Sequence, residues 1–172
     1  PQKFKGVFVN HHETSTGHLH NLKILRNFCN ENSLFLIADC MTSFLSDKPV
    51  EDIAVCDVVI TSSHKGMCCS PGLVFITYKK TLLKHKLKRQ NVSSYVDLNS
   101  YTMCSTTGQP PYTPAVGVIL ELQDMFHFIN SIGYIKWTQE IAKRATVFRQ
   151  EIQREWNIPE HRLSNFMTPI LL

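Results

Sequence analysis

The sequence predicts an α/β fold built on a mostly parallel sheet. Two segments that we predict as strands, 34–38 and 57–61, carry apolar residues at consecutive positions, 34–38 and 58–60, rather than at alternate ones, which is typical of parallel strands covered on both faces. A shorter apolar run at 6–9 precedes them, and apolar residues recur at helical spacing within 17–33. A strand, a helix and a strand in succession form a right-handed crossover, which makes the two strands parallel.

Two chemically functional side chains follow these strands. Asp39 comes directly after the run 34–38, and Lys65 lies in a polar, glycine-bounded turn after the run 57–61. Because open α/β sheets build ligand crevices at the carboxyl ends of their strands, we expect both side chains at one sheet edge. An amine that forms an imine and a carboxylate that keeps a pyridine nitrogen protonated suit a pyridoxal phosphate site. The plainer alternatives are a lysine in a surface turn and a carboxylate that caps a helix.

A third motif precedes both residues and supplies hydroxyl and backbone N–H groups before a helix. This third motif is HETSTG at 12–17. The other two are ADC at 38–40, which contains Asp39, and SSHKG at 62–66, which contains Lys65 and is followed by SPG at 70–72. In this order and spacing they resemble the class V aminotransferases of the fold-type I superfamily. Within that class the chain looks most like the alanine/serine–glyoxylate and 2-aminoethylphosphonate transaminases, although Pro110 stands where the glyoxylate branch tends to place a tyrosine.

The resemblance covers nearly the whole chain and implies its domain organisation. It implies part of a three-layer α/β/α large domain with a seven-stranded type of sheet over 1–133, a connecting helix over 134–157 and the start of a small C-terminal domain over 158–172. Since the chain begins at Pro1 and ends in another apolar run, we expect it to be a middle-to-late portion of a longer polypeptide. The glycine-rich phosphate loop and the substrate-carboxylate arginine of the family would then lie outside it.

The resemblance also implies the site residues and the cofactor, pyridoxal 5'-phosphate. Lys65 would hold the cofactor as a Schiff base and move a proton at the substrate α-carbon, while Asp39 would pair with the pyridine nitrogen. The remaining roles are Thr14 on the ring 3'-oxygen, Met41 packed on the ring, Ser62 and His64 facing the phosphate, and Thr113 reaching the partner subunit's cofactor. The alternatives are a turn role for Thr14, a core role for Met41 and a helix N-cap for Thr113.

The predicted function is therefore a homodimeric aminotransferase with a shared active site. It would transfer an amino group from a small amino-acid or aminophosphonate donor to an oxo acid or aldehyde. Two alternatives stay open: a lyase or cysteine desulfurase of the same fold, and a non-catalytic α/β binding protein in which the lysine is incidental.

Composition supports an ordinary globular chain. It has 172 residues, of which 43% are hydrophobic, and a formal net charge of +4, too mild to indicate nucleic acid. The six cysteines form no C-x-x-C pair, so we expect reduced thiols in the cytoplasm. No apolar run is long enough for a membrane span. Four histidines straddle one turn without the spacing of a metal site, and we predict no metal there: His11, His12, His18 and His20.

Further elements follow from periodicity and from helix-end signals. We expect an antiparallel return strand over 72–78, a basic helix with a solvated face over 79–89 and mostly loop over 91–111. Thr113 and Pro114 predict the start of a helix that Gly133 stops. Regular apolar spacing predicts a second long helix over 134–156, ended by Pro159.

Overall fold

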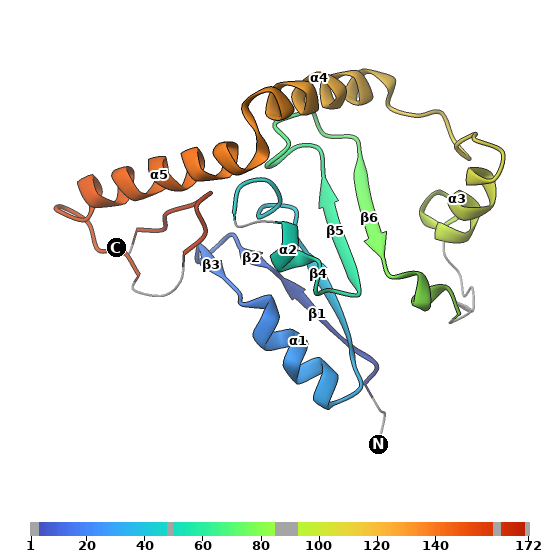
Figure 1. Ribbon diagram of the computed structural model, residues 1–172, viewed down its shortest axis with the longest axis horizontal. Coiled ribbons are helices and arrows are strands. Elements are labelled where there is room, and N and C mark those ends of the chain that lie inside the picture. The colour runs from blue at the N-terminus through green and yellow to red at the C-terminus, as the bar shows by residue number, and fades with distance from the viewer. Residues whose placement is uncertain (1–3, 48–49, 85–92, 160–162, 171–172) are drawn as a thin grey trace.

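A four-stranded sheet lies at the centre of the computed structural model, which describes residues 4–47, 50–84, 93–159 and 163–170 (Figure 1). Its strands, in the spatial order β1-β4-β5-β6, are β1 (Gly6–Asn10), β4 (Phe35–Asp39), β5 (Val58–Ser62) and β6 (Val74–Tyr78). The pairs β1–β4 and β4–β5 are parallel, and β6 runs antiparallel to β5. The prediction of a mixed α/β fold with a mostly parallel sheet and one antiparallel return is confirmed.

The connection from β1 to β4 differs from the single helix predicted over 17–33. A small antiparallel hairpin, β2 (His12–Glu13) and β3 (His18–Leu19), comes first, and helix α1 (Leu22–Glu31) follows. Gly17 adopts a left-handed φ of 69°, which ends the hairpin turn instead of starting a helix. The Asn21 side chain accepts hydrogen bonds from the backbone N–H groups of Lys23 and Ile24, so the helix begins after Asn21.

The main core lies between the sheet and the two helices on one of its faces, α1 and α2 (Val50–Ile53). Leu36, Ala38 and Cys40 are fully buried in it, together with Leu22 and Cys29 from α1. Full burial of a leucine side chain contributes roughly 1.5–3 kcal/mol, so this cluster holds β4 firmly at the centre of the sheet.

The other face of the sheet is more open than predicted. Phe8 on β1 and Val74 on β6 are each 60% exposed, and Ile76 is also exposed. A second core cluster instead lies beyond the carboxyl ends of the strands, where Leu45 and Met67 pack with residues of the long helices. We expected the sheet to be covered on both faces, but within the described part of the chain helices cover only one face.

Two long helices run across the carboxyl edge of the sheet (Figure 1). They are α4 (Val116–Ile132) and α5 (Tyr134–Ile152), and Gly133 with φ 86° separates them. The predicted cap at Thr113 is wrong, because the helix starts at Val116 and has no side-chain cap. The N–H of Val116 bonds to the carbonyl of Pro114 at 2.9 Å, which closes a tight turn where the first helical turn was expected. Helix α5 also ends before the predicted residue 156.

The segment predicted as loop over 91–111 contains a helix, α3 (Leu98–Ser105), which Asp97 caps through its side chain. It has no buried residue, and so it lacks the apolar stripe by which helices are predicted. A 3₁₀ helix, η1 (Lys80–Lys84), opens the predicted basic helix, whose residues 85–89 lie outside the described part. No helix of the described residues combines the length and apolar character that crossing a membrane requires.

Candidate functional site

The register of the sheet brings Asp39 and the Lys65 turn to the same edge. Asp39 pairs with Asn10 of β1 and with Ile60 of β5, and β5 continues to Ser62 before the turn begins. Because these strands are parallel, their carboxyl ends share one edge. The juxtaposition expected from the two apolar runs is therefore present.

Asp39 is half-buried, and a turn orients its carboxylate. Its Oδ1 accepts a hydrogen bond from the backbone N–H of Met41 at 2.9 Å, and its backbone carbonyl accepts one from the N–H of His11 at 2.8 Å. No helix follows, so Asp39 closes a side-chain turn instead of capping a helix. The second bond links Asp39 to His11, the residue directly before the HETSTG motif.

A network of hydrogen bonds around Ser63 fixes the turn that carries Lys65. Ser63 is fully buried, its Oγ donates to the carbonyl of Ser70 at 2.7 Å, and its own carbonyl accepts from the N–H of Cys69 at 3.0 Å. The N–H of Cys68 donates to the carbonyl of Lys65 at 2.9 Å. The half-buried Lys65 side chain thus projects from a rigid loop.

Gly66 joins this turn to the loop that follows Asp39. A Cβ atom at Gly66 would lie 1.9 Å from the backbone oxygen of Phe44, so only glycine permits this approach. The next residue, Met67, is 3% exposed and packs in the second core cluster. The positions of Lys65 and Asp39 are therefore coupled through backbone packing.

Ser62 and His64, which both precede the lysine, lie in different environments. Ser62 is 1% exposed, and its Oγ has no hydrogen-bond partner in the described structure. The neighbouring Thr61 Oγ1 is also buried without a partner. His64 is exposed. A buried hydroxyl without a partner costs roughly 1–3 kcal/mol, so Ser62 marks a place where a bound group would be stabilising.

The HETSTG motif forms a self-bonded turn. Glu13 accepts hydrogen bonds from the N–H of Ser15 at 3.0 Å and from its Oγ at 2.7 Å, and these bonds lower the pKa of Glu13 to about 2. Thr14, between them, is exposed. Gly17 packs against the C-terminal segment, because a Cβ atom there would lie 2.6 Å from the Pro169 ring.

Two buried ionisable residues, His12 at the start of this motif and Asp47, were not among the predicted site residues. His12, considered only as a metal ligand, is 5% exposed, and burial lowers the pKa of its imidazole. Asp47 is 2% exposed and accepts hydrogen bonds from Ser164 Oγ and from the N–H of Asn165. Burial raises the pKa of the Asp47 carboxyl. Its partners are more than a hundred residues away in sequence, so no local pattern could have indicated its place.

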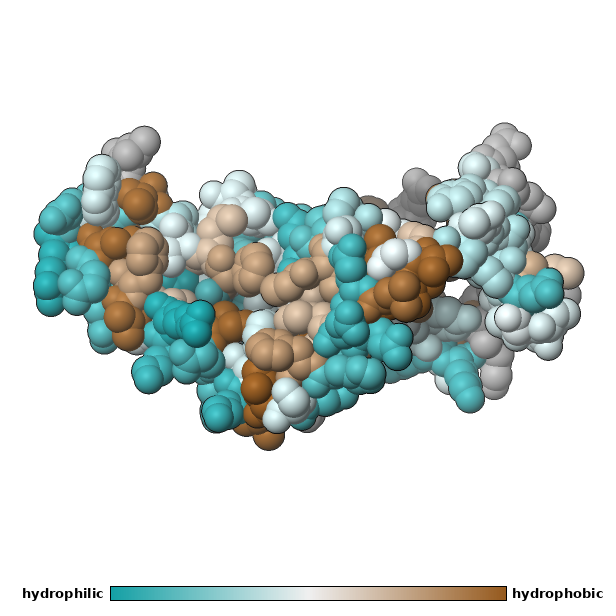
Figure 2. All heavy atoms as spheres, turned by 90° about the horizontal axis from the view of Figure 1, so that it is seen from above, coloured by the Kyte–Doolittle hydropathy of each residue, from teal (hydrophilic) through white to brown (hydrophobic). Residues whose placement is uncertain are grey.

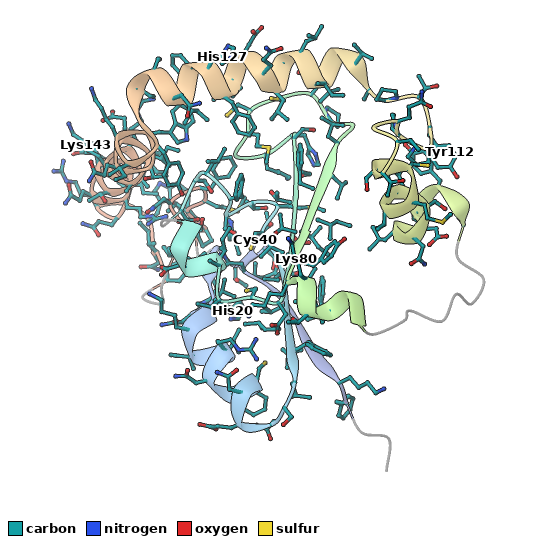
Figure 3. The ribbon with its side chains drawn as sticks, turned by 45° about the vertical axis from the view of Figure 1, so that its right-hand side comes forward. His20, Cys40, Lys80, Tyr112, His127 and Lys143 are labelled. Atoms are coloured by element: carbon teal, nitrogen blue, oxygen red, sulfur yellow. The ribbon has the colours of Figure 1, made fainter. Side chains whose placement is uncertain are left out.

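The last two predicted residues lie on different parts of the molecule. Met41 is half-buried on the loop after Asp39, whereas Thr113 is exposed on the segment between α3 and α4. The fully buried Cys40, labelled in Figure 3, lies beside Met41 in the interior, and burial raises the pKa of its thiol to about 12. The structure thus gathers the other predicted residues around the sheet edge and leaves Thr113 on the protruding segment.

Comparisons with known proteins agree with this architecture. The chain is 28% identical over 133 residues to the soluble hydrogenase 42 kDa subunit of Anabaena cylindrica, a match covering 77% of this chain and 35% of that protein. It is 32% identical over 144 residues to an uncharacterized aminotransferase of Methanocaldococcus jannaschii, covering 81% of this chain and 37% of that protein. The chain therefore spans about a third of the length of these curated relatives.

A solved structure shows the same fold. The subgroup IV aspartate aminotransferase of Thermus thermophilus matches with a TM-score of 0.85 at 22% identity, over 97% of this chain and 48% of that one. The family model for class V aminotransferases matches residues 1–165. With the parallel sheet, and with Asp39 and the Lys65 turn at its carboxyl edge, this match shows that the chain belongs to the class V aminotransferase family.

Proposed function

We propose that the protein is a pyridoxal-phosphate-dependent aminotransferase in which Lys65 carries the cofactor. The observation that supports this most directly is the shared sheet edge, where parallel β4 and β5 end in Asp39 and in the turn of Lys65. The family match and the name of the archaeal relative support the same class of reaction. The expected cofactor also fits the residues present, because the Ser62 hydroxyl is buried without a partner beside this turn.

Asp39 would bind the nitrogen of the pyridine ring. Its Oδ1 is oriented by the N–H of Met41, and the half-buried carboxylate lies at the strand end where a ring could approach. An ionised carboxylate beside a ring nitrogen favours the protonated nitrogen. When bound, the cofactor supplies a ring that withdraws electrons from the substrate α-carbon.

Lys65 would hold the cofactor covalently through Nζ and, when its amine is free, act as the base. In that role Nζ would take a proton from the substrate α-carbon and pass it to C4' of the cofactor within the same half of the exchange, and in the second half it would move a proton in the opposite direction. The hydrogen bonds of the turn around Ser63 fix the backbone from which this side chain extends. Holding a catalytic group close to its substrate lowers the entropic part of the barrier to a proton transfer.

The remaining predicted residues would bind the periphery of the cofactor. Ser62 Oγ would donate to the phosphate, with His64 beside it, and the exposed Thr14 hydroxyl would reach the ring oxygen. Met41 would pack against the ring. Thr113 would bind the phosphate of the partner subunit's cofactor, which requires a homodimer with shared sites. The proposed substrates are a small amino acid or aminophosphonate and an oxo acid or aldehyde, and the proposed location is the cytoplasm.

The test is an absorbance scan of the full-length protein between roughly 300 and 500 nm, followed by borohydride reduction and peptide mapping. We expect a band near the visible edge that becomes fixed on the Lys65 peptide. Lys65→Ala should lose this label and at least about 10³-fold of the transamination rate. The matched control is Lys80→Ala, at an exposed lysine of η1 labelled in Figure 3.

The outcomes separate the alternatives. A protein that stays colourless with added pyridoxal phosphate would overturn the proposal in favour of a non-catalytic binding protein. A coloured protein that releases sulfide from cysteine, or eliminates a substrate group without amino transfer, would indicate a lyase or desulfurase. Label on a lysine other than Lys65 would overturn the assigned anchor.

A further inference from the structure

Two cysteines are neighbours in the loop that carries Lys65, and the proposed function uses neither of them. Cys68 is exposed, Cys69 is half-buried, and both are free thiols. The Cα atoms of consecutive residues are about 3.8 Å apart, so each of these thiols always has the other as a close neighbour. The pair therefore offers two sulfur atoms to one reagent.

The other cysteines lack this combination of access and a second thiol. Cys29, Cys40 and Cys56 are buried, and burial raises the pKa of the Cys40 thiol to about 12 and that of the Cys56 thiol to about 11. Cys104 of α3 is half-buried, and no other cysteine lies near it in the sequence. Among the six cysteines, all of which the structure describes, only the pair at 68 and 69 joins an exposed thiol to a neighbouring one.

The backbone of this pair helps to hold the Lys65 turn. The N–H of Cys68 donates to the carbonyl of Lys65 at 2.9 Å, and the N–H of Cys69 donates to that of Ser63 at 3.0 Å. Cys68 has a left-handed φ of 55°, which is uncommon for a residue other than glycine and persists only where the surrounding structure holds it. A chemical change that moves this backbone therefore acts directly on the turn.

The two sulfur atoms differ in their surroundings. The Cys69 thiol donates to the carbonyl of Met67 at 3.1 Å, and burial together with the nearby Glu121 raises its pKa. Cys68 is the exposed member, and its sulfur is the one that a dissolved reagent meets first. An accessible thiol that is oxidised beside a second thiol is converted to a disulfide. Cys68 is thus suited to be attacked and Cys69 to resolve the product.

We propose that Cys68 and Cys69 are a modification site at which a hydroperoxide forms a disulfide between them. The Cys68 sulfur attacks the peroxide, the O–O bond breaks, an alcohol leaves and Cys68 becomes a sulfenic acid. The Cys69 sulfur then attacks the Cys68 sulfur, the S–O bond breaks, and the hydroxyl group leaves as water with the thiol proton. In sum both thiols lose their hydrogen atoms, and the hydroperoxide is reduced to an alcohol and water.

The disulfide would alter the turn that carries Lys65. Bridged cysteines usually have Cα atoms about 4.4–6.8 Å apart, which is more than consecutive residues allow. Closing the bond therefore requires a change in the backbone at 68 and 69, whose N–H groups bond to Ser63 and Lys65. A bond strained in this way is readily reduced by thiols, so the change is reversible. This consequence for Lys65 rests on the proposed function, whereas the modification itself does not.

The experiment treats the cofactor-free, full-length protein with hydrogen peroxide, blocks the remaining thiols by alkylation and maps the tryptic peptides by mass. Peptide 66–79 contains Cys68 and Cys69 and no other cysteine. We expect this peptide to lose both alkylation sites together and to regain both after dithiothreitol. Cys69→Ser should stop at a sulfenic acid on Cys68 that dimedone traps, and Cys104→Ser, the matched control, should behave like the natural protein.

A second measurement tests the consequence for the turn. After oxidation, the affinity for pyridoxal phosphate should fall roughly tenfold or more in the natural protein and in Cys104→Ser, and dithiothreitol should restore it. In Cys68→Ser the affinity should be the same before and after peroxide. An affinity that oxidation leaves unchanged would overturn the effect on the Lys65 turn.

Three results would overturn the modification site itself. They are a peptide 66–79 that keeps both alkylation sites, a Cys68 that is oxidised while Cys69 stays free, and a disulfide from either residue to another cysteine or another chain. Because the peptide masses are measured without cofactor, they are readable whatever the absorbance test gives. A colourless protein that forms this disulfide would overturn the proposed function and support the modification site.

Discussion

The Lys65 turn and the segment around α3 are opposites in the way this chain stabilises them. The turn has a fully buried serine at its centre, a glycine in backbone contact with Phe44 and a methionine in the core. The segment 93–114, which we call the arm, has apolar side chains in water: Tyr95 is 62% and Met103 is 73% exposed. The turn is thus specified by contacts within the chain, whereas much of the apolar surface of the arm is left uncovered by the described chain.

The arm still has some order of its own. The Tyr112 ring, labelled in Figure 3, lies 5.0 Å from that of Tyr95 and 6.3 Å from that of Tyr101. These ring contacts join both ends of the arm, and it projects away from the sheet (Figure 1). A projecting segment with exposed aromatic and apolar side chains is typical of an interface. This supports the proposed homodimer and the role of Thr113 toward the partner's site.

The face formed by α4 and α5 has both buried and exposed apolar side chains, and in this respect it lies between the Lys65 turn and the arm. Figure 2 shows apolar side chains distributed among polar ones on this face. Those of α4 and α5 with large exposed fractions are Val116, Ile119, Leu120, Phe126, Phe128, Ile135, Val147 and Phe148. Leu122 and Ile129 of α4 and Ala145 of α5 are buried, so each helix packs against this chain on one side and is exposed on the other.

The largest effect is expected from breaking the turn at Gly66. Gly66→Ala would place a Cβ atom 1.9 Å from the Phe44 oxygen, and relief requires movement of one backbone segment. We expect a loss of about 3 kcal/mol or more in the free energy of unfolding. Cofactor affinity should fall as well, because the displaced segments carry Lys65 and follow Asp39. Urea unfolding and a cofactor titration measure both effects.

Gly117→Ala is the matched control for this substitution. Gly117 lies within α4, and a Cβ atom there would meet nothing within 4 Å. Alanine is the better helix former by roughly 0.5–1 kcal/mol, so this variant should be slightly more stable than the natural protein. Equal stability of the two variants would show that the backbone contact at Gly66 is unimportant.

A smaller effect, visible only in assembly, is expected from the arm. Met103→Glu places a charge on its most exposed large apolar residue. If the arm lies in the dimer interface, the dissociation constant of the dimer should rise by about tenfold or more, while the unfolding of the subunit changes by less than about 0.5 kcal/mol. Sedimentation equilibrium measures this constant. Ile24→Glu on α1, at a site 65% exposed, is the control and should leave it unchanged.

The same contrast explains how much could be predicted from sequence. Strands β4 and β5, the antiparallel β6 and the shared edge of Asp39 and Lys65 follow from local apolar runs. Helix α3 could not be predicted because none of its apolar side chains is buried in a core. The predicted start of α4 was wrong because a turn at Pro114 stands where the cap was expected. The division into large domain, connecting helix and small domain remains a prediction, as do the roles of the site residues.

Local sequence patterns could not identify residues whose contacts are with residues far away in the sequence. Asp47 meets Ser164, and the carbonyl of Gly17 accepts from the Ser164 N–H at 2.8 Å. Both contacts arise only when the C-terminal segment docks beside the hairpin.

His12 looked like one of four histidines in a turn. His11 is equally buried, but its Nδ1 is hydrogen-bonded with Ser43 Oγ, whereas neither ring nitrogen of His12 has a partner in the described structure. Sequence reasoning therefore placed the ends of β4 and β5 to within one residue, but it did not identify the groups packed behind them.

The smallest effect should come from the contact that joins the turn to α4. Glu121 accepts hydrogen bonds from the N–H of Ser70 at 2.7 Å and from its Oγ at 3.0 Å. Glu121→Gln keeps one acceptor oxygen but loses the charge, and since Glu121 is exposed we expect a loss of about 1 kcal/mol. Glu140→Gln breaks an exposed ion pair with Arg144 within α5 and should cost only about 0.3–0.5 kcal/mol. If both variants unfold at the same urea concentration, Glu121 does no more than an ordinary surface charge, and the rigidity of the turn comes from Ser63 and Gly66 alone.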